Sequence, residues 1–161
     1  MSFVLDKTVD MRIIYEAAKK VYARTVTVTA AVKDLSQKVG ARESSLQMYF
    51  NIYACMRKGK VYKMGTSESF TQFLLENILY DEGPEAFRNA LISVKSNSAY
   101  RTSKNNAQPG LIRACQNVIA ASGIPIDFES LPLDFSEEKE NVISGQTEIS
   151  EADMDQLRKC I

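Results

Sequence analysis

Histidine and tryptophan are absent from this sequence, and cysteine occurs only three times. Without histidine the chain offers no imidazole general base, no Ser-His or Cys-His nucleophile pair and no histidine ligand for a metal ion. It also has no glycine-rich phosphate loop and no pair of acidic residues at a spacing that indicates a shared metal. We therefore predict a protein that is not an enzyme, with no catalytic residue, no metal site and no cofactor. Carboxylate or lysine chemistry is the alternative that these absences leave open.

Long apolar runs are also lacking. No stretch approaches the length of a membrane span, and the N-terminus, MSFVLDKTVD, lacks the basic-then-apolar order of a signal peptide. Cys55, Cys115 and Cys160 are odd in number and widely separated, so they indicate neither a disulfide framework nor a zinc site. These features predict a cytoplasmic protein with no membrane partner. Its cysteines are interpreted as small buried apolar groups or, for Cys160, as a terminal thiol.

The net charge of zero conceals an uneven distribution along the chain. Residues 1–113 contain 17 Lys and Arg against 10 Asp and Glu, whereas residues 114–161 contain 3 against 10. A basic body with an acidic end is typical of a nucleic-acid binder whose tail competes for the same surface or recruits another molecule. The alternative is that charge simply falls unevenly over solvated faces.

Apolar residues at helical spacing dominate the rest of the sequence. The 161 residues are 45% hydrophobic and 25% charged, which is the composition of one globular domain with a sizeable core. Apolar positions that recur every three or four residues predict an all-α fold, a compact bundle of about five to six helices. The predicted helices are Thr8 to Ala23, a short helix that ends at Gly40, a long helix from Glu43 to Gly59, a helix capped by Ser67 that ends near Gly83, Pro84 to Tyr100, and Pro109 to Ser122.

Two segments between these helices are predicted to be irregular. Thr25 to Thr29 is a β-branched run without a partner strand, so we expect an extended connector in which Thr29 is the N-cap of the next helix. Ser96 to Asn106 is rich in serine and asparagine and carries Arg101 and Lys104. We interpret it as a loop, and a solvated connector is favoured over a contact with phosphates.

The chain is predicted to divide into a helical domain, residues 1–123, and an acidic tail, residues 124–161. The tail has two prolines, many carboxylates and no sustained period, so it is expected to lie extended over the body or to be disordered. Phe128 and Phe135 are predicted to dock on the body or on a protein partner. Ser150 begins a capping-box pattern, which predicts a short terminal helix that needs a surface to pack on.

The stretch from Asp34 to Lys60 predicts two helices joined by a tight glycine turn, a helix-turn-helix-like unit over residues 30–59. In such a unit the first helix braces the second, which presents its outer face to a DNA groove. The second helix is apolar around much of its circumference, so only its first turns are expected to face outward. The predicted DNA contacts are Arg42, Ser44, Ser45, Gln47 and Asn51 on the outer face, with Arg57, Lys58, Lys60 and Lys63 placed for phosphates.

An ordered set of short motifs lies between about Lys33 and Tyr100. They are Ser44-Ser45-Leu46, Tyr49 with Asn51, Met56 with Gly59, Tyr62-Lys63, Leu75-Glu76-Asn77-Ile78, Asp81 with Gly83, and Ala86 through Ala90-Leu91 to Val94. In this order they resemble a helical module on the N-terminal side of bacterial HNH-type restriction endonucleases. The resemblance implies a DNA-facing accessory domain joined to a nuclease domain. Because the chain has no histidine, and Asn97 stands where that module's histidine is expected, the resemblance implies DNA binding or defence without nuclease activity.

These observations favour a DNA-binding helix-turn-helix protein, either a regulator or a non-catalytic specificity element of a restriction or phage-defence system, with duplex DNA as its partner. The alternative is a protein-interaction module, such as an inhibitor, antitoxin or adaptor, that binds a partner through its acidic apolar tail. A reader of RNA or of modified bases is a further alternative, for which Tyr49, Tyr53, Tyr62 and Tyr100 offer rings. Repressors of this kind usually dimerise, which leaves a homodimer open.

Overall fold

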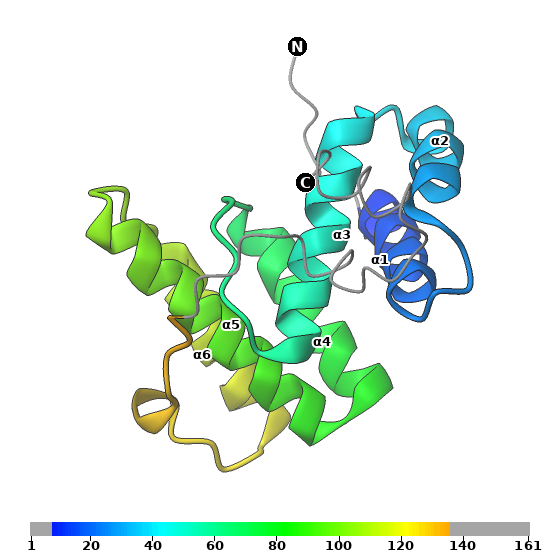
Figure 1. The fold of residues 1–161 in the computed structure, drawn as a ribbon. Coiled ribbons are helices and arrows are strands. Elements are labelled where there is room, and N and C mark those ends of the chain that lie inside the picture. Colours follow the sequence, from blue (N-terminus) through cyan, green and yellow to red (C-terminus); the bar gives the residue numbers. More distant parts are fainter. Residues whose placement is uncertain (1–7, 136–161) are drawn as a thin grey trace. The chain divides into compact units, whose positions relative to one another are not determined.

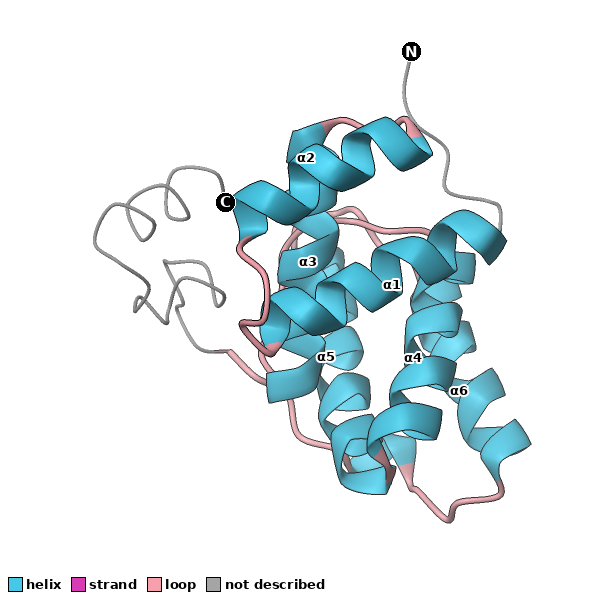
Figure 2. Cartoon of the chain, turned by 90° about the vertical axis from the view of Figure 1, so that its right-hand side faces the viewer, coloured by secondary structure: helices cyan, strands magenta, loops and turns pink. Residues whose placement is uncertain are grey.

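The computed structural model describes residues 8–135, and over this range the chain is helical with no strand (Figures 1 and 2). The elements are α1 (Thr8–Tyr22), α2 (Val28–Val39), α3 (Glu43–Lys58), α4 (Glu68–Glu82), α5 (Pro84–Ser103), α6 (Pro109–Ser122) and a 3-10 turn, η1 (Phe128–Ser130). The predicted all-α class is therefore confirmed, with six α-helices in the part of the chain that is described. The predicted terminal helix from Ser150 and the thiol of Cys160 lie outside the described residues.

Contacts divide the chain into two compact units, and each is described by itself. Within the described range, the first unit holds residues 8–54 and the second holds residues 55–135, so the boundary falls inside α3. The first unit contains α1, α2 and most of α3. The second contains the end of α3, α4, α5, α6 and η1.

The first unit is built around aromatic and aliphatic side chains of its three helices. Tyr53 of α3 meets the ring of Tyr15 edge-on, with ring centroids 5.7 Å apart, and the ring of Tyr22 in the same way at 5.8 Å. Such edge-to-face contacts stabilise aromatic pairs beyond the area that they bury. The other large buried side chains of this unit are Ile14, Val32, Leu35, Leu46, Phe50 and Ile52.

The start of α2 differs from the prediction. Thr27, not Thr29, is the N-cap: its backbone is extended and its hydroxyl accepts a hydrogen bond from the Ala30 N–H at 3.1 Å. The expected connector is shorter as a result, because α2 already begins at Val28. The helix ends at Gly40, whose φ of 74° is left-handed and whose N–H donates to the Ser36 carbonyl. A glycine tolerates this conformation without the strain that a Cβ brings, as the predicted glycine turn requires.

The second unit packs α4, α5 and α6 against one another. Ser67 caps α4 as predicted, since its hydroxyl accepts from the Phe70 N–H at 3.1 Å, and Pro84 takes the first position of α5. The side chains that fill this core are Phe70, Leu74, Leu75, Ile78, Phe87, Leu91, Val94, Leu111, Cys115 and Val118.

Helix α5 is longer than predicted, because it continues to Ser103 through the segment interpreted as a loop. The polar residues at the start of this segment, Ser96, Asn97 and Ser98, are buried, whereas those from Thr102 onward are exposed. Ser96 donates to the Ile92 carbonyl at 2.7 Å and accepts from the Asp134 N–H at 2.7 Å. The prediction of a loop was wrong from Ser96 to Ser103, because side chains such as Ser96 and Asn97 find partners inside the protein; residues 104–106 do lie outside the helix.

A row of polar residues spaced four apart on α5, Asn89, Ser93, Asn97 and Arg101, forms what we call the α5 stripe. Its side chains donate to backbone carbonyls at the end of α3 and in the connection that follows it. Ser93 Oγ lies 2.6 Å from the Lys60 carbonyl oxygen. Asn97 Nδ2 donates to the carbonyls of Tyr62, at 2.5 Å, and Met64, at 3.1 Å. The connection between α3 and α4 is therefore fixed along α5 by its backbone.

The segment after α6 is also fixed to α5. The Lys95 ammonium donates to the carbonyls of Phe128, Glu129 and Leu131 at 2.9, 3.1 and 2.7 Å, and it lies 5.2 Å from the centroid of the Phe128 ring. Asp134 accepts from the Val61 N–H at 2.7 Å, which joins this segment to the α3–α4 connection. The described start of the predicted tail is thus laid over the second unit.

Candidate nucleic-acid interface

The helical hairpin of α2, Gly40 and α3 carries the first set of predicted DNA contacts. Arg42 and Ser44 are exposed at the start of α3, and Ser45 and Gln47 are half-buried. Asn51 is only 8% exposed, so its predicted place on the outer face was wrong. The reason is that Asn51 lies within an unbroken run of buried residues, from Phe50 to Met56, in which every side of the helix is covered.

The residues predicted for phosphates belong to the second unit. The Arg57 side chain is 21% exposed and pairs with Glu82 at 3.5 Å, so it is already committed to a neighbour. Lys58 and Lys63 are exposed, and Lys60 is half-buried. Of this set, the exposed lysines are the residues that a phosphate can reach.

A cluster that the sequence did not predict lies around Tyr100. The ammonium groups of Lys63 and Lys104 lie 5.3 and 5.7 Å from the centroid of its ring, at distances typical of cation–π contacts. Arg101 lies beside Gly65, where a Cβ would be 3.1 Å from its guanidinium atoms, and its Nη1 is 3.5 Å from the Lys63 carbonyl oxygen. We call Lys63, Tyr100, Arg101 and Lys104 the Tyr100 cluster. The signal that could have found it was the four-residue spacing of Tyr100 and Lys104 across the C-terminal end of α5, where Lys104 is the C-cap.

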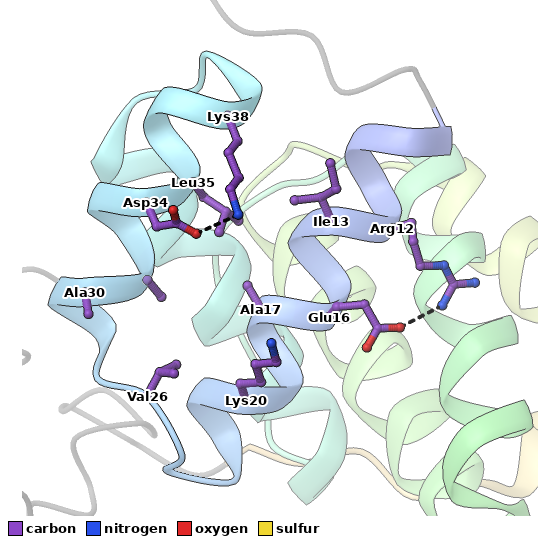
Figure 3. Close-up of a pocket in the computed structure, with 11 residues that line it drawn as sticks. Arg12, Ile13, Glu16, Ala17, Lys20, Val26, Ala30, Asp34, Leu35 and Lys38 are labelled. Atoms are coloured by element: carbon purple, nitrogen blue, oxygen red, sulfur yellow. Dashed lines mark hydrogen bonds and ion pairs between the residues drawn. The ribbon is translucent and has the colours of Figure 1, made fainter.

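A groove of about 440 Å³ lies between α1 and α2 in the first unit (Figure 3). Its apolar lining comes from small and branched side chains, and two ion pairs lie beside them: Arg12 with Glu16 at 3.2 Å and Lys38 with Asp34 at 3.1 Å. The apolar lining consists of Ile13, Ala17, Val26, Ala30, Ala31 and Leu35. Its shape and lining do not by themselves identify a ligand.

Two buried groups of the second unit, the Tyr62 hydroxyl and the Cys115 thiol, are held in their neutral forms by a raised pKa. Burial raises the pKa of the Tyr62 hydroxyl above its ordinary value, and the neighbouring Cys115 and Cys55 raise it further. Burial also raises the pKa of the Cys115 thiol to about 12. A thiol that stays protonated is a poor nucleophile. Within residues 8–135 no group of three or more Cys, Asp or Glu side chains could hold a metal ion.

The two predicted tail contacts have different environments. Phe128 is buried against the second unit under the Lys95 ammonium, so it docks on the body and is not presented to a partner. Phe135 is 72% exposed.

None of the helices in the described range is both long and apolar enough to cross a membrane.

Comparisons with protein-family models, curated proteins and solved structures find no match for this chain. The resemblance to the HNH-associated module therefore stays a resemblance of motif order. At Asn97, where that module is expected to carry histidine, the side chain is fully buried and donates to two backbone carbonyls. This position has a structural role in the present chain.

Proposed function

We propose that this protein binds duplex DNA as a non-catalytic helix-turn-helix-type protein. The observation that carries the proposal is the start of α3, which follows the left-handed turn at Gly40: Arg42, directly before the helix, and Ser44, in its first turn, are both exposed. In helix-turn-helix proteins the N-terminal residues of the second helix contact base edges while the first helix crosses the backbone. The arginine fork and the serine hydroxyl are both suited to base edges or phosphate oxygens.

The charge of the first unit supports the same proposal. Its described residues, 8–54, contain seven Lys and Arg against four Asp and Glu. A basic surface supplies the sequence-independent part of DNA affinity, because each neutralised phosphate releases counterions. Glu43 is exposed beside Arg42 and opposes this attraction locally, so we expect a modest affinity that depends on salt.

The biological setting follows from the motif resemblance alone. We propose a regulator or a specificity element of a restriction or phage-defence system, in which cleavage, if it occurs, belongs to another protein. Its DNA partner would be recognised through the start of α3.

Fluorescence anisotropy of a labelled duplex, measured with the full chain at several salt concentrations, tests the proposal. Binding should weaken steeply with salt. Arg42→Ala should weaken binding about three- to tenfold and reduce the salt slope by about one. Arg88→Ala is the matched control, because Arg88 is also an exposed arginine but lies on α5 in the second unit. Absence of salt-dependent binding, or equal effects of the two substitutions, would contradict DNA binding by α3.

A second candidate function is protein interaction through the acidic apolar tail, and the exposure of Phe135 favours it. A photo-crosslinking amino acid at position 135 should then capture a specific partner in cells. The same probe at Tyr80, which is 87% exposed, is the control for random collisions. Identical products from both positions would count against the interaction.

A further inference from the structure

We infer that the Tyr100 cluster is a binding site for a phosphate group. The cluster belongs to the second unit, whereas the residues that carry the proposed DNA contact of α3 belong to the first. The site therefore stands on its own observations, whether or not α3 binds DNA.

The first observation is that two ammonium groups are gathered on one ring. Lys63 comes from the connection between α3 and α4, and Lys104 follows the last residue of α5, yet both lie within 5.7 Å of the Tyr100 ring centroid. Like charges gathered near one ring repel each other, and a bound multivalent anion offsets that repulsion. The ring faces attract both cations and keep them in place before any anion arrives.

The second observation is the position of Arg101. Its guanidinium is held against the backbone at Gly65, so closely that a Cβ at residue 65 would lie 3.1 Å from three of its atoms. Its Nε is buried without a hydrogen-bond partner among the described residues. The guanidinium thus brings a third positive charge to the cluster in a nearly fixed position, and a planar guanidinium matches the geometry of phosphate oxygens.

The third observation is how the backbone beneath the cluster is fixed. The carbonyls of Tyr62 and Met64, on either side of Lys63, accept hydrogen bonds from Asn97, one helical turn before Arg101. The lysine and the arginine are therefore attached to segments that are joined to each other. A site assembled in this way loses little conformational entropy when an anion binds.

The ligand chemistry is a phosphate monoester or diester. It could come from a free nucleotide or from the backbone of a nucleic acid, because both present the same phosphate oxygens to lysine and arginine side chains. The exposed positions of Lys63 and Lys104 give a ligand access to the site.

A single reporter residue makes the site measurable. Because the sequence has no tryptophan, Tyr100→Trp places the only indole at the cluster and keeps a ring that cations favour. Titration of this full-length variant with inorganic pyrophosphate should give a saturable change in its fluorescence. In the Lys63→Ala, Lys104→Ala background the affinity should fall at least about tenfold, since two charge-assisted contacts are lost. A Lys20→Ala, Arg88→Ala background removes the same charge from exposed positions elsewhere and should leave the affinity unchanged.

The unsubstituted chain provides an independent readout. Pyrophosphate should shift the backbone amide signal of Gly65 in proton–nitrogen correlation spectra at the same concentrations. The inference would be overturned if pyrophosphate did not shift the Gly65 signal and if, in addition, the fluorescence change was absent, did not saturate, or was equally strong in the Lys63→Ala, Lys104→Ala background.

Competition then identifies the source of the phosphate. If a short single-stranded or duplex oligonucleotide displaces pyrophosphate, the site takes a nucleic-acid backbone; if neither does, it takes a free phosphate compound. Both results support a phosphate site. Failure of pyrophosphate to bind at the Tyr100 cluster is distinguishable from failure of α3 to bind DNA, because DNA binding by α3 is measured separately with Arg42→Ala and a labelled duplex.

Discussion

Replacing Asn97 with alanine should be the most damaging single change in the second unit outside its apolar core. The side chain is fully buried and donates to the carbonyls of Tyr62 and Met64. A buried acceptor that loses its donor destabilises the folded state by about 1–3 kcal/mol. Two acceptors lose their donor, and the small cavity left by the amide adds to the loss. Removal of the Asn97 Oδ1, which is buried without a hydrogen-bond partner among the described residues, offsets part of it, so we expect the free energy of unfolding to fall by about 2–3 kcal/mol. This is a large share of the stability of an ordinary domain.

Urea unfolding followed by far-ultraviolet circular dichroism measures this loss. Asn89→Ala is the matched control, because Asn89 lies two turns earlier on the same face of α5 but makes one longer hydrogen bond, 3.3 Å to the Arg57 carbonyl, and is half-buried. We expect the control to lose about 1 kcal/mol or less. If Asn97→Ala destabilises the protein no more than Asn89→Ala does, then the hydrogen bonds of the α5 stripe do not fix the α3–α4 connection.

Three further changes test the neighbourhood of the same core. Tyr62→Phe should be neutral or stabilise by up to about 1 kcal/mol, because the buried hydroxyl has no hydrogen-bond partner among the described residues; a clear loss in thermal unfolding would contradict this. Burial raises the pKa of Cys115 to about 12, so mass spectrometry should find this thiol unmodified by iodoacetamide until the protein unfolds. The hydrogen bond from Arg113 lowers the pKa of the Glu68 carboxyl, so Arg113→Gln should raise its titration midpoint in carbon-detected spectra. The stability from this pair is present above the ordinary pKa of glutamate and is lost as the pH falls through the lowered one. An unchanged midpoint would rule out the pairing.

Local sequence signals predicted most of the helices because their causes are local. The hydroxyl of Ser67 and the left-handed turn at Gly40 act within a few residues of themselves, and both are found where the sequence placed them. Local signals alone do not decide where α2 starts, because Thr27 and Thr29 can both act as an N-cap. Starting the helix at Val28 places that residue on the buried face with Val32 and decides between them.

The end of α5 could not be predicted from local composition. Serine and asparagine favour loops when their only partners are nearby backbone groups. Here the partners of Asn97 are carbonyls more than thirty positions away in the sequence. The Tyr100 cluster was missed for the same reason, because Lys63 reaches Tyr100 only after the α3–α4 connection has been laid along α5.

The start of α3 was predicted in part. Its apolar circumference correctly indicated that most of the helix is buried, yet Asn51 was assigned to the outer face on its polarity alone. A single asparagine within an apolar run is weak evidence of exposure, since the neighbours decide which way that part of the helix faces.

The side chains of the α5 stripe bind the backbone carbonyls of the connection after α3, and not the side chains of that connection. Every amino acid carries such a carbonyl. The outward-facing positions of that connection, such as Lys63, can therefore change identity while the chain keeps its path. A surface built in this way can acquire a different ligand by one or two substitutions without a new fold. A designer could therefore change its charges while the backbone beneath them stays in place.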